Sequence, residues 1–210
     1  MKEKLRKYQS RHIETIVNDI FALNCLFWAV FGLILDIQEN SLSIVRICTS
    51  ILHVVACILL FFRIVSILQF NKNDTIVFVF SVLLTGFLFK TSQPFYSWPL
   101  IYNISFIMGT LISCTALLNL GKSFAILPSK KEVVQSGLYR IIRHPAYFGE
   151  IILTLTCFFI NPVLYRTVPL ILCILCFFYR INVEEQILSQ DNQYQKYMKR
   201  VRWKIFPKIW

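Results

Sequence analysis

Six long apolar stretches constrain this chain more than any other feature of its sequence. They lie at about residues 15–35, 44–69, 75–90, 99–120, 146–160 and 163–182. A bilayer core about 30 Å thick is crossed by roughly 17–25 apolar residues in a helix, and backbone groups in lipid must pair within their own segment. Because the stretches are long and do not alternate between polar and apolar residues, they predict membrane-spanning helices rather than strands.

The composition supports this interpretation. Of the 210 residues 56% are hydrophobic and only 16% are charged, against about 25% charged in ordinary soluble domains. These values exclude a disordered protein, a coiled coil and a typical soluble enzyme. The third and fifth stretches are short, so five spans remain the alternative to six. Asn161 and Pro162 leave room only for a tight turn, which predicts that the last two spans form an antiparallel hairpin.

The positive charges are distributed unevenly along the chain. There are 22 Lys and Arg residues against 11 Asp and Glu residues, and a soluble protein with this net charge of +11 suggests nucleic-acid binding. In a six-span layout only Arg46, Lys90 and Arg166 fall in the outside segments, which leaves 19 on the other side. Since cytoplasmic loops are enriched in Lys and Arg, the charge reports topology rather than nucleic-acid binding.

We therefore expect an all-α, polytopic integral membrane protein with six, alternatively five, transmembrane helices and a C-terminal amphipathic helix. The whole chain, residues 1–210, should form a single membrane domain. Both termini and the long polar loop at 121–145 should be cytoplasmic. The amphipathic helix is predicted from apolar residues at near-helical spacing, namely Ile187, Leu188, Tyr194, Tyr197, Met198 and Val201. It should lie on the cytoplasmic face.

Cysteine and histidine residues give weaker indications. All seven cysteines lie in apolar stretches, where buried packing is the usual role. Cys173 and Cys176 form a CxxC pair, but no second pair of ligands lies nearby, so we expect no metal. His53 lies in the middle of the second span, where an ionisable residue is a functional candidate. The more common alternative is a neutral histidine that bonds to a neighbouring helix.

Two polar motifs flank the predicted hairpin. The first, RHPAYFGE at 143–150, leads into the fifth span, and the second, Glu184-Glu185, follows the sixth. Pro145 is suited to the first turn of a helix, His144 to the capping position before it, and Glu150 to the positive end of the helix dipole. A well-built helix start therefore also explains the first motif. In an antiparallel hairpin, however, His144, Tyr147 and the two glutamates lie at the same depth. Together they predict a pocket of mixed charge, suited to a zwitterionic or charged cofactor.

These motifs resemble a known family. GLYRIIRHPAYFG at 137–149, a helical hairpin, Glu184-Glu185, Tyr194, Tyr197 and Pro207 together resemble the isoprenylcysteine carboxyl methyltransferase family, which shares features with phospholipid methyltransferases. The resemblance covers about residues 119–208. The N-terminal spans at 1–118 carry no recognised motif.

The resemblance implies an integral membrane methyltransferase that binds S-adenosylmethionine and methylates a lipophilic acceptor, either an isoprenylcysteine-like carboxylate or another lipid-like molecule. The hairpin would then form the cofactor site. The residues expected to bind the cofactor are Tyr139, His144, Pro145, Tyr147, Glu184 and Glu185. Arg143 would position an acceptor carboxylate with Arg202, and Glu184 would be the base for an amine or thiol acceptor. Membrane lipids are the expected surroundings, and neither a metal nor nucleic acid is expected to take part.

Two other functions remain as alternatives. Phe148-Gly149-Glu150 is similar to a motif of sterol and steroid reductases, which use a nicotinamide cofactor, although the Glu184–Glu185 pair would repel its phosphates. Asp191-Asn192 and Lys204 differ from the residues usual in the methyltransferase family, which keeps open a non-enzymatic membrane protein with the same fold.

Overall fold

The computed structural model describes residues 2–64, 72–92, 94–124 and 132–210, and these residues form helices and connecting segments without any strand. The long helices are α1 (Lys2–Gln38), α2 (Ile44–Phe61), α3 (Lys72–Lys90), α4 (Leu100–Leu120), α5 (Pro145–Phe159), α6 (Leu164–Leu188) and α7 (Asn192–Arg200). Three short 3-10 turns complete the fold, η1 (Phe95–Ser97), η2 (Gly121–Ser123) and η3 (Gly137–Arg140). The expected all-α class is confirmed.

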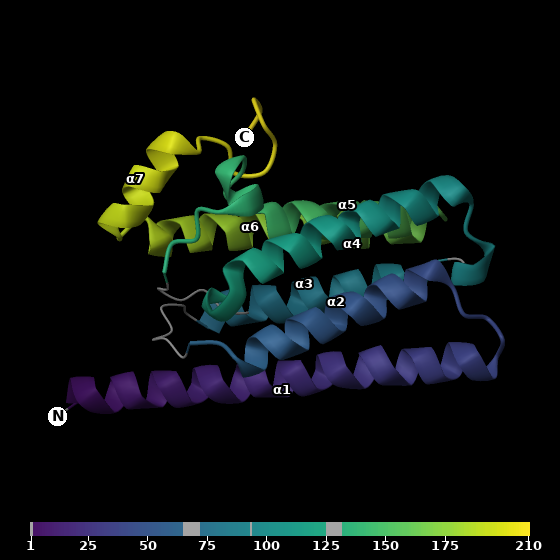
Figure 1. Ribbon diagram of the computed structural model, residues 1–210, viewed down its shortest axis with the longest axis horizontal. Coiled ribbons are helices and arrows are strands. Elements are labelled where there is room, and N and C mark those ends of the chain that lie inside the picture. Colours follow the sequence, from purple (N-terminus) through teal and green to yellow (C-terminus); the bar gives the residue numbers. More distant parts are fainter. Residues whose placement is uncertain (1, 65–71, 93, 125–131) are drawn as a thin grey trace.

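The first six helices lie alongside one another and alternate in direction, as Figure 1 shows. The N-terminus, α7 and the C-terminal segment all lie toward the same end of this bundle. The most extensive contacts join α4 to α5, α1 to α2 and α3 to α6. The two helices of the predicted hairpin, α5 and α6, do contact each other, but each packs more extensively against a neighbour from the preceding part of the chain.

Within the residues that the structure describes, four helical segments are long and apolar enough to cross a membrane, namely Glu14–Gln38, Ile44–Phe61, Leu100–Ser123 and Leu164–Leu188. The helix Pro145–Phe159 is apolar but shorter. Large apolar side chains such as Leu100, Leu164 and Ile20 are exposed on the outside of the bundle, where lipid would cover them. The chain is therefore an integral membrane protein, and the count of six spans stays a prediction.

The contact between α4 and α5 depends on small residues. A Cβ atom added at Gly149 would lie 2.8 Å from the backbone nitrogen of Ser113 and 2.9 Å from the carbonyl oxygen of Gly109. These separations are shorter than a van der Waals contact, so only glycine fits on α5 at this point. The close approach holds the start of α5, and with it the RHPAYFGE motif, firmly against α4.

Arginine residues join the helices at both ends of the bundle. Arg46 pairs with Asp36 at 3.0 Å and Arg63 with Asp19 at 2.9 Å, which ties α2 to α1 near each of its ends. Arg166 is fully buried and donates to the carbonyl oxygens of Leu88 and Cys157 at 2.8 and 2.5 Å, as well as to those of Phe158 and Asn161. Its positive charge thus lies at the carboxyl ends of α3 and α5, where helix carbonyls lack partners.

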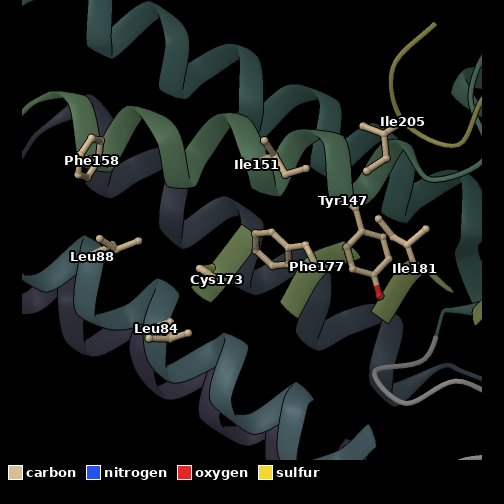
Figure 2. Packing of buried hydrophobic residues seen from close by; sticks show 9 residues of the cluster. All are labelled: Leu84, Leu88, Tyr147, Ile151, Phe158, Cys173, Phe177, Ile181 and Ile205. Carbon is tan, nitrogen blue, oxygen red and sulfur yellow. The ribbon is translucent and has the colours of Figure 1, made fainter. Parts of the chain in front are cut away.

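The core next to the predicted site lies between α3, α5, α6 and the C-terminal segment. Figure 2 shows its nine buried residues, Leu84, Leu88, Tyr147, Ile151, Phe158, Cys173, Phe177, Ile181 and Ile205. Cys173 is fully buried in this core, as expected for a packing cysteine. Tyr147 is the one residue of the RHPAYFGE motif in this cluster, so it connects the apolar core to the polar site described below.

Candidate functional site

The N-terminus of α5 forms the centre of the candidate site. Pro145 occupies the first turn and His144 the capping position, as the sequence predicts. The backbone N–H groups of Arg143 and His144 donate to the carbonyl oxygens of Trp203 and Lys204, both at 2.9 Å. The C-terminal segment is therefore bonded directly to the start of α5, in a position to cover the site.

Glu185 is the most heavily bonded side chain of the site. Its two oxygens accept from Nε and Nη2 of Arg143 at 2.8 and 2.9 Å, in a bidentate pair. One of these oxygens also lies 2.7 Å from Nε2 of His144 and accepts from the Tyr194 hydroxyl at 2.7 Å. The carboxylate thus joins α6 to the start of α5 and to α7, and most of its capacity to accept hydrogen bonds is used.

Arg143 is held as tightly as its partner. Besides the two bonds to Glu185, its Nη1 donates to the carbonyl oxygens of Val201 and Arg202, each at 2.8 Å. Burial alone would lower the pKa of Arg143, but the hydrogen bonds and charge of Glu185 raise it overall, so the guanidinium stays charged. Four of its five N–H groups are used within the protein, and its side chain is only 7% exposed.

Glu184 lies next to Glu185 in the chain but in different surroundings. One oxygen accepts a hydrogen bond from the Tyr147 hydroxyl, and the other lies 3.7 Å from Nδ1 of His144. The side chain is 24% exposed, against 10% for Glu185. Glu184 therefore keeps acceptor capacity for a bound molecule, which Glu185 does not.

Helix α7 closes the polar end of the site. It begins at the capping residue Asp191, which accepts from the backbone of Gln193 at 2.7 Å, and its buried face carries Tyr194 and Tyr197. The Tyr197 hydroxyl donates to the carbonyl oxygen of Tyr139 at 2.7 Å. Burial raises the pKa of both α7 tyrosines above the ordinary value, so both hydroxyls remain protonated donors.

Gly137 sets the position of Tyr139. Its φ of +56° is a conformation that other residues rarely adopt, and an added Cβ atom would overlap the side chain of Asn119. The turn that follows, η3, buries Tyr139 against Ala116 of α4 and the tyrosines of α7. Burial raises the pKa of Tyr139 as well.

A cavity of about 930 Å³ begins at this polar end and continues between the helices. Of the residues predicted for the site it is lined by Tyr139, Arg143, His144, Tyr147 and Glu184. Pro145, Glu185 and Arg202 do not line it, and the Arg202 side chain is exposed. The structure thus brings the two motifs together as the hairpin argument predicts. It separates Arg202 from the cavity because only the backbone of that residue reaches Arg143.

Sequence reasoning did not assign Glu150 and Arg180 to the site, although both line the cavity close to the two motifs. The Arg180 guanidinium lies over the rings of Phe78 and Tyr147, 4.8 and 5.0 Å from their centres, and donates to the Ser81 hydroxyl at 3.2 Å. Arg180 lies four residues before Glu184, which places both side chains on one face of α6. This spacing could have identified Arg180 as a residue of the site from the sequence. Glu150 was interpreted as part of a helix start and of the reductase-like Phe148-Gly149-Glu150 motif, and not as a residue of the methyltransferase site.

The remaining candidates are placed as follows. His53 lines the cavity, but its Nδ1 lies 2.8 Å from the carbonyl oxygen of Thr49 in its own helix, not against a neighbouring helix. All seven cysteines are free, and six of them are buried. In the part of the chain that the structure describes, no group of three His, Cys, Asp or Glu side chains is arranged to hold a metal ion, and the expected absence of a metal stays a prediction.

We compared the chain with known proteins and protein families. No curated protein matches the chain. The model of the isoprenylcysteine carboxyl methyltransferase family matches residues 100–190, from the start of α4 to just beyond the end of α6. The matched segment contains both motifs at the polar end of the cavity, Arg143–Glu150 and Glu184-Glu185. The match covers less than half of the chain and supports, over these residues, the resemblance to the isoprenylcysteine carboxyl methyltransferase family.

Proposed function

We propose that this protein transfers a methyl group from S-adenosylmethionine to a lipophilic acceptor within the membrane. The observation that carries the proposal is the cavity of about 930 Å³, whose wall combines Glu184, His144 and Tyr147 with a long apolar interior. Its volume lies at the upper end of the roughly 300–1,000 Å³ typical of small-molecule sites. A polar cofactor and part of an apolar acceptor therefore fit side by side.

The residues at the polar end fit the charges of the cofactor. S-adenosylmethionine carries an ammonium, a carboxylate and a sulfonium. Glu184 would hold the ammonium, because its carboxylate is partly exposed and lines the cavity. The backbone N–H groups of Ala146 and Tyr147, in the first turn of α5, have no partner within the helix and would bind the carboxylate. The rings of Tyr139 and Tyr147 offer flat surfaces for the adenosine.

Three residues of the predicted site would act without touching the cofactor. Glu185 would hold Arg143, His144 and Tyr194 in place, since its oxygens are already bonded to all three. Pro145 would set the start of α5. Arg143 would hold Glu185 and the C-terminal segment in place, and at most its one unused N–H group would be directed at an acceptor.

The bound cofactor supplies an activated methyl group, and the protein supplies alignment. Methyl transfer is an in-line displacement, so much of the rate comes from holding the acceptor atom opposite the bond that breaks. The apolar helices would admit the acceptor from the bilayer and keep water away from the reacting atoms. This arrangement suits an acceptor with a long apolar tail.

A ligand-binding measurement in detergent tests the proposal. We expect S-adenosylmethionine and its demethylated product to raise the melting temperature of the purified protein, and NADPH to leave it unchanged. The Glu184→Gln variant should bind S-adenosylmethionine about 10- to 100-fold more weakly, because a charged hydrogen bond contributes roughly 1.5–3 kcal/mol. Lys196→Gln is the control variant, since the Lys196 side chain is exposed on α7 and does not line the cavity.

The outcomes separate the competing functions. Stabilisation by NADPH alone would favour the reductase alternative. No stabilisation by either cofactor would contradict both enzymatic functions and leave a non-enzymatic membrane protein. Equal binding by Glu184→Gln and the unchanged protein would remove Glu184 from the site.

A further inference from the structure

The charged groups that line the cavity near the start of α5 are mostly carboxylates. Glu132, Glu150 and Glu184 all line this end, against the guanidinium groups of Arg143 and Arg180. The charge of Arg143 is already balanced by Glu185 in a bidentate pair. Among the protein's own groups at this end of the cavity, carboxylates therefore outnumber the guanidinium groups that are not already paired.

Glu150 is the carboxylate that the proposed cofactor site does not use. It lies on α5 five residues after Pro145, or about 7 Å farther along the helix axis. Among the described residues its carboxylate has no hydrogen-bond or ion-pair partner, although its backbone carbonyl accepts from Thr154 at 2.8 Å. A carboxylate on the wall of a cavity inside a membrane protein needs a partner, because burying an uncompensated charge is costly.

Arg180 does not serve as that partner through a direct bond. Its guanidinium is held between the rings of Phe78 and Tyr147 and donates to Ser81. It lies close enough to Glu150 and Glu184 for electrostatic interaction with both. With Glu184 assigned to the ammonium of the cofactor, Glu150 is left without a directly bonded partner in the described part of the chain, and a ligand that donates hydrogen bonds would supply one.

The neutral polar groups deeper in the cavity favour the same kind of ligand. The hydroxyls of Thr49, Ser81 and Thr85 line the cavity, and each donates to a carbonyl of its own helix, at 2.6, 2.7 and 2.9 Å. The ring of His53 is likewise bonded through Nδ1 to a carbonyl, which can only accept, so Nδ1 donates and Nε2 is left as an acceptor. The Ser81 oxygen already accepts from Arg180, and the Thr85 hydroxyl lies 3.3 Å from Sγ of Cys173, so the lone pairs left for a ligand that donates hydrogen bonds are mainly those of Thr49 and His53.

From these observations we propose that Glu150 binds the ammonium group of a lipophilic amine, which is the methyl acceptor, and takes its proton. This inference rests on the proposed methyltransferase function and specifies its substrate class. The cavity offers little to a carboxylate acceptor, because Arg143 is engaged by Glu185 and two carbonyls and Arg202 lies outside the wall.

The reaction balances with the groups named. The acceptor ammonium gives one proton to the Glu150 carboxylate, which frees the nitrogen lone pair. The nitrogen then forms a bond to the methyl carbon as the bond between that carbon and sulfur breaks, and the electron pair stays on sulfur to give a neutral thioether. The product is a methylated ammonium, and the proton leaves Glu150 when the product is released. Glu184 is less suited to this role, because it already accepts from Tyr147 and lies beside His144.

The experiment uses the full-length protein in detergent micelles with radiolabelled S-adenosylmethionine. Four acceptors are compared, namely oleylamine, oleyl alcohol, oleic acid and a farnesylated cysteine with a free carboxylate and a blocked amine. We expect methyl incorporation into oleylamine alone. The Glu150→Gln variant should lower kcat for the amine by about 100-fold, as typical for a lost general base, and Glu150→Asp should restore part of it.

Controls separate this inference from the function on which it rests. S-adenosylmethionine should stabilise Glu150→Gln as much as the unchanged protein, and Lys196→Gln should methylate the amine at the normal rate. Methylation of oleic acid, the alcohol or the farnesylated cysteine in place of the amine would overturn the inference while supporting the methyltransferase function. Full amine methylation by Glu150→Gln would also overturn it. Failure of S-adenosylmethionine to stabilise the unchanged protein would overturn both.

Discussion

At the scale of single residues, two adjacent glutamates have different surroundings and therefore different expected roles. Glu185 faces Arg143, His144 and Tyr194 and is nearly buried, whereas Glu184 lines the cavity. Because consecutive residues of a helix point about 100° apart, neighbours in the chain need not share an environment. One glutamate holds the site together and the other remains available to a ligand.

The difference leads to a prediction for Glu185→Gln. Loss of the negative charge leaves the Arg143 guanidinium buried without its ion-pair partner, and breaking a buried pair typically costs about 3–5 kcal/mol. We expect a clear fall in thermal stability, measured in detergent without any ligand. Glu184→Gln is the matched comparison and should melt close to the unchanged protein. Equal melting of the two variants would contradict the assignment of Glu185 as the structural carboxylate.

At the scale of elements, the site depends on how closely α5 approaches α4. The backbone of Ser113 and Gly109 lies within 3 Å of the place where a side chain at Gly149 would begin. The start of α5 is also bonded to the C-terminal segment through Arg143 and His144. The motif is therefore positioned from two sides by parts of the chain that are distant in sequence.

Gly149→Ala tests this contact. The added methyl group meets backbone atoms that cannot rotate away, so α5 must shift and overpacking should cost about 1–3 kcal/mol. Gly86→Ala is the control for the melting temperature, because no atom lies within 4 Å of the added group at that position in α3. We expect a lower melting temperature for Gly149→Ala alone, and this variant should also bind S-adenosylmethionine more weakly than the unchanged protein. Equal behaviour of the two variants would show that the α4–α5 contact tolerates separation.

At the scale of the whole molecule, the alternating direction of α1 to α6 places the N-terminus and α7 at the same end of the bundle (Figure 1). The excess of Lys and Arg in the segments at this end predicts that it is cytoplasmic. Orientation and the number of spans are linked, because an even number of spans returns the chain to the side where it starts.

Cysteine labelling tests this topology. Tyr96→Cys, in η1, and Gln190→Cys, between α6 and α7, place exposed thiols near opposite ends of the bundle, whereas six of the native cysteines are buried. With a membrane-impermeant maleimide on intact cells we expect labelling at position 96 and none at position 190 until the membrane is opened. Labelling of position 190 from outside would favour five spans, with α5 re-entrant.

Much of the candidate site was predictable because helices convert spacing into geometry. The short turn at Asn161-Pro162 predicted that His144, Tyr147 and Glu184 lie at one depth, and the structure places all three on the wall of one cavity. Arg180 lies four residues before Glu184 on α6, so helical spacing places it on the same face. Its charge, however, was interpreted only as evidence for the orientation of the protein in the membrane. Glu150 was missed because a carboxylate near a helix start has a sufficient local explanation.

The sequence by itself determined the apolar helices, the polar motifs and the methyltransferase resemblance, because length, hydropathy and local spacing are properties of the chain alone. Only the tertiary structure decided which polar groups are already satisfied. Arg143 and Glu185 bond each other and the C-terminal segment, and this removes both from the groups most available to a ligand. Whether a side chain is free depends on partners distant in the sequence, and hydrogen-bonding capacity, once used by the protein, is no longer available for binding.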